Sequence, residues 1–151
     1  MKWHTAAHTQ YLIELMAPLN RRKVASAMAL GRRTVGTIYR RTRPDENGTK
    51  RQRAEVRFDD IAGCLRTPAG GSSRQTILVV EGKTLRSRLL SPREAARLMG
   101  LSDDFRLPAG YNHAYHVCGD GVCVPVVRHI ARHILEPLLK ANRNLERIAA
   151  E

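Results

Sequence analysis

The stretch Ser91-Pro92-Arg93-Glu94-Ala95-Ala96-Arg97-Leu98-Met99-Gly100 decides the fold. Ser91 can cap the amino end of a helix, Pro92 suits the first helical position, and Glu94 can return a hydrogen bond to the cap. The residues that follow place small and apolar side chains on one face, and Gly100 stands where a left-handed residue ends a helix. The sequence therefore predicts a short helix over residues 92–99, capped at both ends.

Two longer stretches, one on each side, also have helical spacing. Apolar residues recur from 125 to 139 on one side of a helix whose other side is charged, and Pro137 predicts a kink within it. Residues 9–30 follow the same spacing, but Pro18 has no backbone N–H to donate and should break or kink the run. We therefore expect a long carboxy-terminal helix and an interrupted amino-terminal one.

Strand signals lie between these helices. Side chains alternate over residues 35–39, and a returning segment at 56–58 follows Asn47-Gly48, a pair that favours the tip of a hairpin. Residues 61–67 and 76–80 also have the composition of strands. Together with the helices, these segments predict an α+β fold: a small irregular β domain with a short capped helix and a long carboxy-terminal helix.

The distribution of charge points to a polyanionic partner. The 151 residues contain 26 Lys and Arg against 14 Asp and Glu, so the formal net charge is +12. Residues 21–57 hold twelve of these cations and three carboxylates, which concentrates +9 of that charge in one stretch. Most of the cations are Arg, and a guanidinium can form paired hydrogen bonds with phosphate or guanine. Nucleic-acid contact is favoured over the alternative, a basic face that is merely solvated.

Several other classes of protein are not expected. The longest apolar runs, such as residues 77–80, are too short to span a bilayer, and the amino terminus has no signal-peptide core. Three cysteines are an odd number and do not suggest a disulfide framework. We therefore expect a soluble intracellular protein with reduced thiols, in the cytoplasm with the nucleoid and not at a membrane.

Two groups of residues have the composition of a metal or phosphate site without its spacing. Cys118, Cys123, His129 and His133 include permitted zinc-ligand spacings, but only five residues separate Cys123 from His129, where a finger needs about a dozen. Residues 70–73, Gly-Gly-Ser-Ser, lack the following Lys of a phosphate-binding loop. We therefore predict no metal site and no loop of that kind.

Three segments resemble sequence blocks of the DNA cytosine-5 methyltransferases. Residues 86–105, which include the capped helix and Ser-Asp-Asp-Phe after it, are similar to the ninth block of that family. Residues 119–126, Gly-Asp-Gly-Val-Cys-Val-Pro-Val, are similar to the tenth block. Residues 62–68 resemble the short segment that closes the target-recognition region. The resemblance implies that residues 3–57 form the variable target-recognition region itself.

Enzymes of that family flip a cytosine out of duplex DNA, attack its C6 with a cysteine thiolate and methylate C5 from S-adenosylmethionine. The blocks for this chemistry do not occur in the 151 residues, which contain no Pro-Cys, Phe-x-Gly-x-Gly or Glu-Asn-Val. The resemblance therefore implies the target-recognition portion of a DNA (cytosine-5-)-methyltransferase, with the catalytic blocks on another chain or lost. Residues 1–110 would be the recognition domain, and residues 111–151 would pack on a catalytic domain. The alternative is a stand-alone, non-catalytic basic DNA-binding module.

The resemblance and the charge pattern together give the expected site residues. DNA contacts are expected from Arg40, Arg41, Arg43, Arg66, Arg74, Gln75, Arg86 and Arg88. A contact to S-adenosylmethionine is expected from Gly119, Asp120, Gly121 and Val122, where Asp120 replaces an Asn of the family and would repel the carboxylate of the cofactor unless screened. No catalytic residue and no metal are expected. The expected partners are duplex DNA and a catalytic methyltransferase subunit, with which alone the cofactor would bind.

Overall fold

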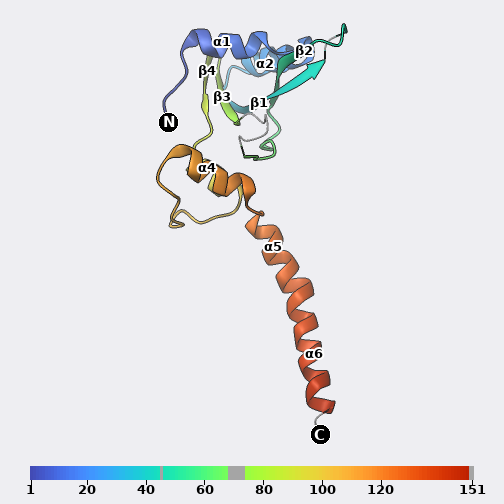
Figure 1. Ribbon diagram of the computed structural model, residues 1–151. Helices are drawn as coiled ribbons and strands as arrows, with labels where there is room; N and C mark the ends of the chain where they lie inside the picture. Colours follow the sequence, from blue (N-terminus) through green and yellow to red (C-terminus); the bar gives the residue numbers. More distant parts are fainter. Residues whose placement is uncertain (45, 68–73, 150–151) are drawn as a thin grey trace.

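A computed structural model describes residues 1–44, 46–67 and 74–149 of the chain (Figure 1). A four-stranded antiparallel sheet of order β2-β1-β3-β4 lies at its centre, which confirms the predicted α+β class. The elements in chain order are α1 (Ala6–Glu14), α2 (Pro18–Ala29), β1 (Thr34–Pro44), β2 (Lys50–Arg57), β3 (Thr76–Glu81), β4 (Thr84–Leu89), α3 (Pro92–Leu98), α4 (Tyr111–Asp120), α5 (Val124–Ile130), a π-helical turn η1 (Ala131–Leu135) and α6 (Glu136–Ala149).

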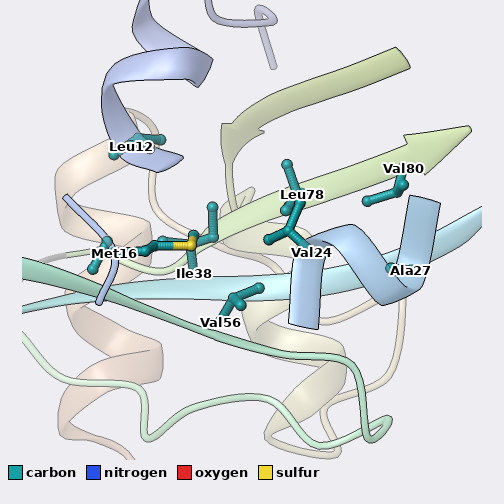
Figure 2. Packing of buried hydrophobic residues seen from close by; sticks show 9 residues of the cluster. Leu12, Met16, Val24, Ala27, Ile38, Val56, Leu78 and Val80 are labelled. Carbon is teal, nitrogen blue, oxygen red and sulfur yellow. The ribbon is translucent and has the colours of Figure 1, made fainter. Parts of the chain in front are cut away.

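Helices α1 and α2 cover one face of the sheet. Pro18 ends the first helical run and occupies the first turn of α2, because its missing N–H is tolerated only there. Figure 2 shows the core that results, in which Leu12 and Met16 meet Ile38 and Leu78 of the sheet. All four side chains are at most 2% exposed, so truncating one to alanine should cost about 2 to 5 kcal/mol.

Helices α3 and α4 form a second apolar cluster with the end of β4. The predicted cap is confirmed: the Ser91 hydroxyl accepts from the Glu94 backbone N–H, and the Glu94 side chain accepts from the Ser91 backbone N–H. Gly100 has φ +76°, as the predicted carboxy-terminal cap requires. Tyr115 of α4 is buried against this cluster, and its hydroxyl accepts from the backbone N–H of Gln75 at 3.2 Å.

The β1–β2 hairpin is longer than the sequence pattern suggested. Its ladder still pairs Pro44 with Lys50, whereas the pairing of β1 with β3 ends at Ile38. The far half of the hairpin therefore extends past the rest of the sheet (Figure 1). Gly48 has φ +75°, so the predicted Asn47-Gly48 turn lies at the tip as expected.

Two parts of the fold differ from the expectation. The prediction of a strand over residues 61–67 was wrong: this segment joins no ladder, and side chains from elsewhere hold it in place. Helix α4 was not predicted, because no side chain caps its amino end and its sequence mixes polar residues and Gly with the apolar ones. The Gly/Ser-rich residues 70–73 lie outside the described residues.

Segments α5, η1 and α6 form a continuous rod that points away from the sheet (Figure 1). Pro137 has no N–H for the carbonyl of His133 and crowds it, so the irregularity expected at Pro137 takes the form of a π turn directly before it. Seven large apolar side chains of the rod are each more than 40% exposed: Val126, Val127, Ile130, Ile134, Leu135, Leu138 and Leu139. We call these seven residues the rod stripe. None of the described helices is long and apolar enough to cross a membrane.

Candidate nucleic-acid interface

One face of the hairpin carries arginines in directly opposed pairs. The β1–β2 register places Arg41 opposite Arg53 and Arg43 opposite Arg51. Opposed residues in an antiparallel ladder share one face, with Cβ atoms about 5 Å apart, so like charges there destabilise the sheet. We call these four positions the arginine face. A polyanion bound against it would relieve the repulsion, as few other ligands could.

A tyrosine anchors the inner end of the arginine face. The Tyr39 hydroxyl donates to the Glu55 carboxylate at 2.6 Å, and this hydrogen bond raises the pKa of Tyr39. The guanidinium of Arg41 lies 4.9 Å from the centre of the Tyr39 ring, a cation–π distance. The ring therefore holds the guanidinium of Arg41 on this face, while Arg41 as a whole residue stays exposed.

Arg40 lies on the opposite face of the hairpin. Successive strand residues alternate between faces, so Arg40 shares a face with buried Ile38 and not with Arg41. Its guanidinium donates to the Gln52 amide oxygen at 3.3 Å, across the ladder on that same face. The structure thus separates Arg40 from Arg41, whereas the register gives residue 43 a position on the same face as Arg41.

The two arginines predicted on β4 have different environments. The guanidinium of Arg86 lies 4.8 Å and that of Arg88 lies 5.4 Å from the centre of the Trp3 ring. Arg86 is about half exposed and reaches Glu81 at 3.3 Å. The Arg88 side chain is only 19% exposed, and its guanidinium donates to both carboxylate oxygens of Glu94, at 2.7 and 2.8 Å. Arg88 therefore has a structural partner inside the protein, whereas Arg86 remains accessible.

The Arg88–Glu94 pair joins β4 to the cap of α3. The hydrogen bonds from Arg88, together with those from Ser91, lower the pKa of Glu94 to about 2. The same contact raises the pKa of Arg88. Glu94 is thus ionised throughout the physiological range and fully engaged, which suits a fixed structural ion pair and not a proton donor.

The remaining predicted DNA contacts lie around α4. Arg66 is exposed, and Arg74 donates to the Asn112 side chain while lying 5.4 Å from the Tyr111 ring centre. Gln75 is only 4% exposed, and its amide donates to the Cys64 carbonyl at 3.4 Å. In this conformation Gln75 holds the segment over residues 61–67 and does not reach the surface.

The segment predicted to approach a cofactor ends helix α4. The Thr67 hydroxyl donates to Asp120 Oδ1 at 2.6 Å. A Cβ added at Gly119 would lie 2.7 Å from the Thr67 backbone nitrogen, so only glycine allows the two segments to approach so closely. The structure thus places residues 66–67 in direct contact with Gly119 and Asp120, so two of the three segments that resemble family blocks meet here.

The thiols and imidazoles do not form a site. Burial raises the pKa of the Cys118 thiol, which opposes formation of the nucleophilic thiolate. The rings of His129 and His133 contact each other on the rod, with centres 4.4 Å apart. Among the described residues no group of three or more His, Cys, Asp or Glu side chains could hold a metal ion.

Sequence reasoning missed Arg51 and Arg53, which complete the arginine face from β2. Both are counted in the basic stretch over residues 21–57, but neither is among the expected DNA contacts. The signal was available in the Asn47-Gly48 turn, because counting outward from a hairpin tip gives the cross-strand partner of each residue.

Comparisons with known proteins match the chain to one protein family. A sequence model of the C-5 cytosine-specific DNA methylases matches residues 3–136. The chain is 38% identical over 66 residues to the type II methyltransferase M1.ScrFI of Lactococcus lactis subsp. cremoris, 44% of this chain and 17% of that protein. It is 40% identical over 57 residues to M.NlaX of Neisseria lactamica, 38% of this chain and 18% of the relative.

A third relative is the DNA-cytosine methyltransferase of Escherichia coli K12, which is 44% identical over 59 residues, 36% of this chain and 12% of that enzyme. The chain thus spans less than a fifth of the length of each of these relatives. No solved structure matches it. Because the family match covers both apolar clusters, the hairpin and half of the rod, the chain belongs to the C-5 cytosine-specific DNA methylase family.

Proposed function

We propose that this chain is the target-recognition portion of a DNA cytosine-5 methyltransferase and that it binds duplex DNA through the arginine face. The observation that carries the proposal is the β1–β2 register of this chain, a member of the methylase family. The register sets Arg41 opposite Arg53 and Arg43 opposite Arg51. A two-stranded ribbon fits the major groove, where arginines can contact phosphates or the O6 and N7 atoms of guanine. The like charges that weaken the free hairpin would then favour the bound state.

The other predicted residues divide between contact and support. Exposed Arg66 and Arg86 are proposed to contact the phosphate backbone, and Arg74 extends this set beside α4. Gln75 and Arg88 are proposed to act indirectly, because their side chains hold residues 61–67 and the α3 cap.

We propose that the chemical step is carried out by a catalytic methyltransferase domain on another polypeptide, onto which the rod stripe packs. An apolar stripe of this length rarely stays in water on a protein that acts alone. In this proposal residues 1–110 recognise DNA and residues 111–151 dock, although α4 within the second part also completes the core of the first. Substituting Leu138 and Leu139 by Lys should abolish co-purification with that domain while leaving DNA binding within twofold.

Enzymes of this family use S-adenosylmethionine, and the residues near Asp120 suit one part of it. The carboxy-terminal end of a helix carries partial negative charge, and Asp120 adds a carboxylate at the last position of α4. This end could accept the ammonium group of the cofactor and would disfavour its carboxylate. Bound S-adenosylmethionine would supply the methyl group, while Asp120 and the exposed Gly121 and Val122 would help to hold it beside the partner.

A second candidate is a stand-alone basic module that binds DNA without catalysis. The sheet and its two apolar clusters favour it in one respect, since this chain supplies all the side chains of both clusters. Radiolabelled methyl transfer to DNA, measured with the chain alone and with a candidate catalytic partner, separates the two. Transfer that requires both chains supports the recognition subunit, and a partner that neither binds nor is activated supports the module.

DNA binding itself is tested by a matched pair of variants. Arg41→Ala/Arg53→Ala removes one opposed pair from the arginine face, and Arg128→Ala/Arg132→Ala removes the same charge from the rod. The first variant should lower affinity for duplex DNA at least tenfold and reduce the slope of log K against log salt by about 2, since each lost phosphate contact accounts for about 0.9. Equal losses in both variants would exclude the arginine face as the interface.

A further inference from the structure

A groove of about 790 Å³ lies between α2 and the end of β2. Arg22 and Lys23 of α2, Arg32 of the following loop and Arg57 of β2 all line it. Gly31, with φ +66°, turns the chain after α2 and so brings Arg32 back to the groove.

The charge of this groove is strongly one-sided. Its single carboxylate, Asp59, is held by Arg57 at 2.7 Å. Arg22, Lys23 and Arg32 form no ion pair with any residue that the structure describes. Helix α2 itself contains no acidic residue. Three cations therefore remain available to an anionic ligand.

The groove adjoins the arginine face. Tyr39 and Arg57 line the groove, and their register places them on the same face of the hairpin as Arg41 and Arg53. Duplex DNA presents one phosphate charge about every 1.7 Å along its axis, so a duplex lying on the hairpin extends well beyond it. We propose that the groove binds the sugar–phosphate backbone of DNA that flanks the recognised site, an inference that rests on the proposed DNA-binding function.

The groove also has an apolar component, so a peptide is an alternative ligand. Leu19 and Leu30 line it and are 58% and 56% exposed. An acidic peptide with apolar anchors would match both features. DNA is the favoured occupant because the groove continues from a face whose opposed arginines favour a polyanion.

The test compares two duplexes that share one central sequence, one of roughly 10 base pairs, a single helical turn, and one of roughly 30. The variant Arg22→Gln/Lys23→Gln/Arg32→Gln should weaken binding of the long duplex at least tenfold and lower its salt slope by about 2 to 3. It should leave the short duplex within twofold of the parent protein. The control Arg128→Gln/Arg132→Gln/Lys140→Gln removes the same charge from the rod and should change neither.

Each outcome decides a separate point. Three outcomes would overturn the flanking-DNA assignment. They are an unchanged affinity of the groove variant for the long duplex, an equal loss of affinity for both duplexes, and an equal loss of affinity in the control variant. The first of these would point instead to an acidic peptide. Parallel measurements on Arg41→Ala/Arg53→Ala keep the two proposals apart. If that variant binds both duplexes as tightly as the parent, the proposed function fails; if it weakens both while the groove variant weakens neither, only the groove inference fails.

Discussion

Thr67 Oγ1 and Asp120 Oδ1 lie 2.6 Å apart and join the segment over residues 61–67 to the last residue of α4. The close packing of Gly119 on the Thr67 backbone and the Gln75 hydrogen bond to Cys64 support the same junction. Side chains therefore replace a β ladder as the means of ordering this stretch.

Removing the Thr67 hydroxyl should loosen that junction. Thr67→Ala is expected to cost about 1 kcal/mol of unfolding free energy, since the lost hydrogen bond has a charged acceptor but is exposed to solvent. Amide hydrogen exchange of residues 61–67 should accelerate, while that of β3 stays unchanged. Thr67→Ser retains the hydroxyl and should behave as the parent; unaltered exchange in Thr67→Ala would mean that the junction does not depend on this bond.

The opposed arginines should make the free protein less stable than it could be. Arg53→Thr removes one member of a like-charge pair and introduces a strand-favouring residue, so unfolding free energy should rise by a few tenths of a kcal/mol at low salt. The gain should shrink as salt is added, and affinity for DNA should fall. Arg40→Thr, which faces Ala54 across the ladder, is the control and should give no salt-dependent gain.

Acid should weaken the contact between β4 and α3. The pKa of Glu94 is lowered to about 2 by Arg88 and Ser91, so its stabilising effect is complete above about pH 4.5 and is lost as pH falls toward 2. After allowance for solvent screening, this effect amounts to about 1 to 2 kcal/mol. Between pH 6 and pH 3, the unfolding free energy measured with urea should fall less in Glu94→Gln than in the parent protein. Glu46→Gln, in the exposed hairpin turn, should follow the parent curve.

A second pH effect is expected at the amino terminus. The backbone N–H of His4 donates to the Ser87 carbonyl at 2.9 Å, and His4 Nδ1 lies 3.0 Å from the Ser87 hydroxyl. Burial, with the charges of His8 and Arg40, lowers the pKa of His4, so the folded state binds fewer protons than the unfolded chain. Stability should therefore be complete above about pH 6.5 and decline below it. His4→Asn should flatten the pH dependence of the unfolding midpoint between pH 7.5 and pH 5.5, and an unchanged pH dependence would contradict this. His113→Asn, at an exposed position of α4, is the control.

The parts of the fold that could be predicted are those decided by local chemistry. The Ser91–Glu94 cap, the helix break at Pro18 and the Asn47-Gly48 hairpin tip each depend on residues within a few positions of one another. Residues 61–67 could not be assigned correctly, because a strand-like composition forms a strand only where a partner strand is available. Their partners are side chains from outside the segment: Gln75, 11 residues after Cys64, and Asp120, 53 residues after Thr67.

The same limit applies to the candidate interface. Arg40 and Arg41 are neighbours in sequence, yet the two-residue period of a strand sends them to opposite faces. Arg88 and Gln75 look like surface residues by type, and only tertiary contacts reveal the ion pair of one and the burial of the other. The resemblance correctly identified the family, but it gave no information about which side chains face solvent.

Trp3 is the sole tryptophan of the chain, and its indole ring lies against the guanidinium groups of Arg86 and Arg88. Fluorescence excited at tryptophan-selective wavelengths thus comes from Trp3 alone. The intensity of indole fluorescence responds to a nearby cation. A phosphate that draws Arg86 away should alter this signal without any attached dye. The protein carries its own optical probe at one proposed contact, so occupancy there can be followed in real time.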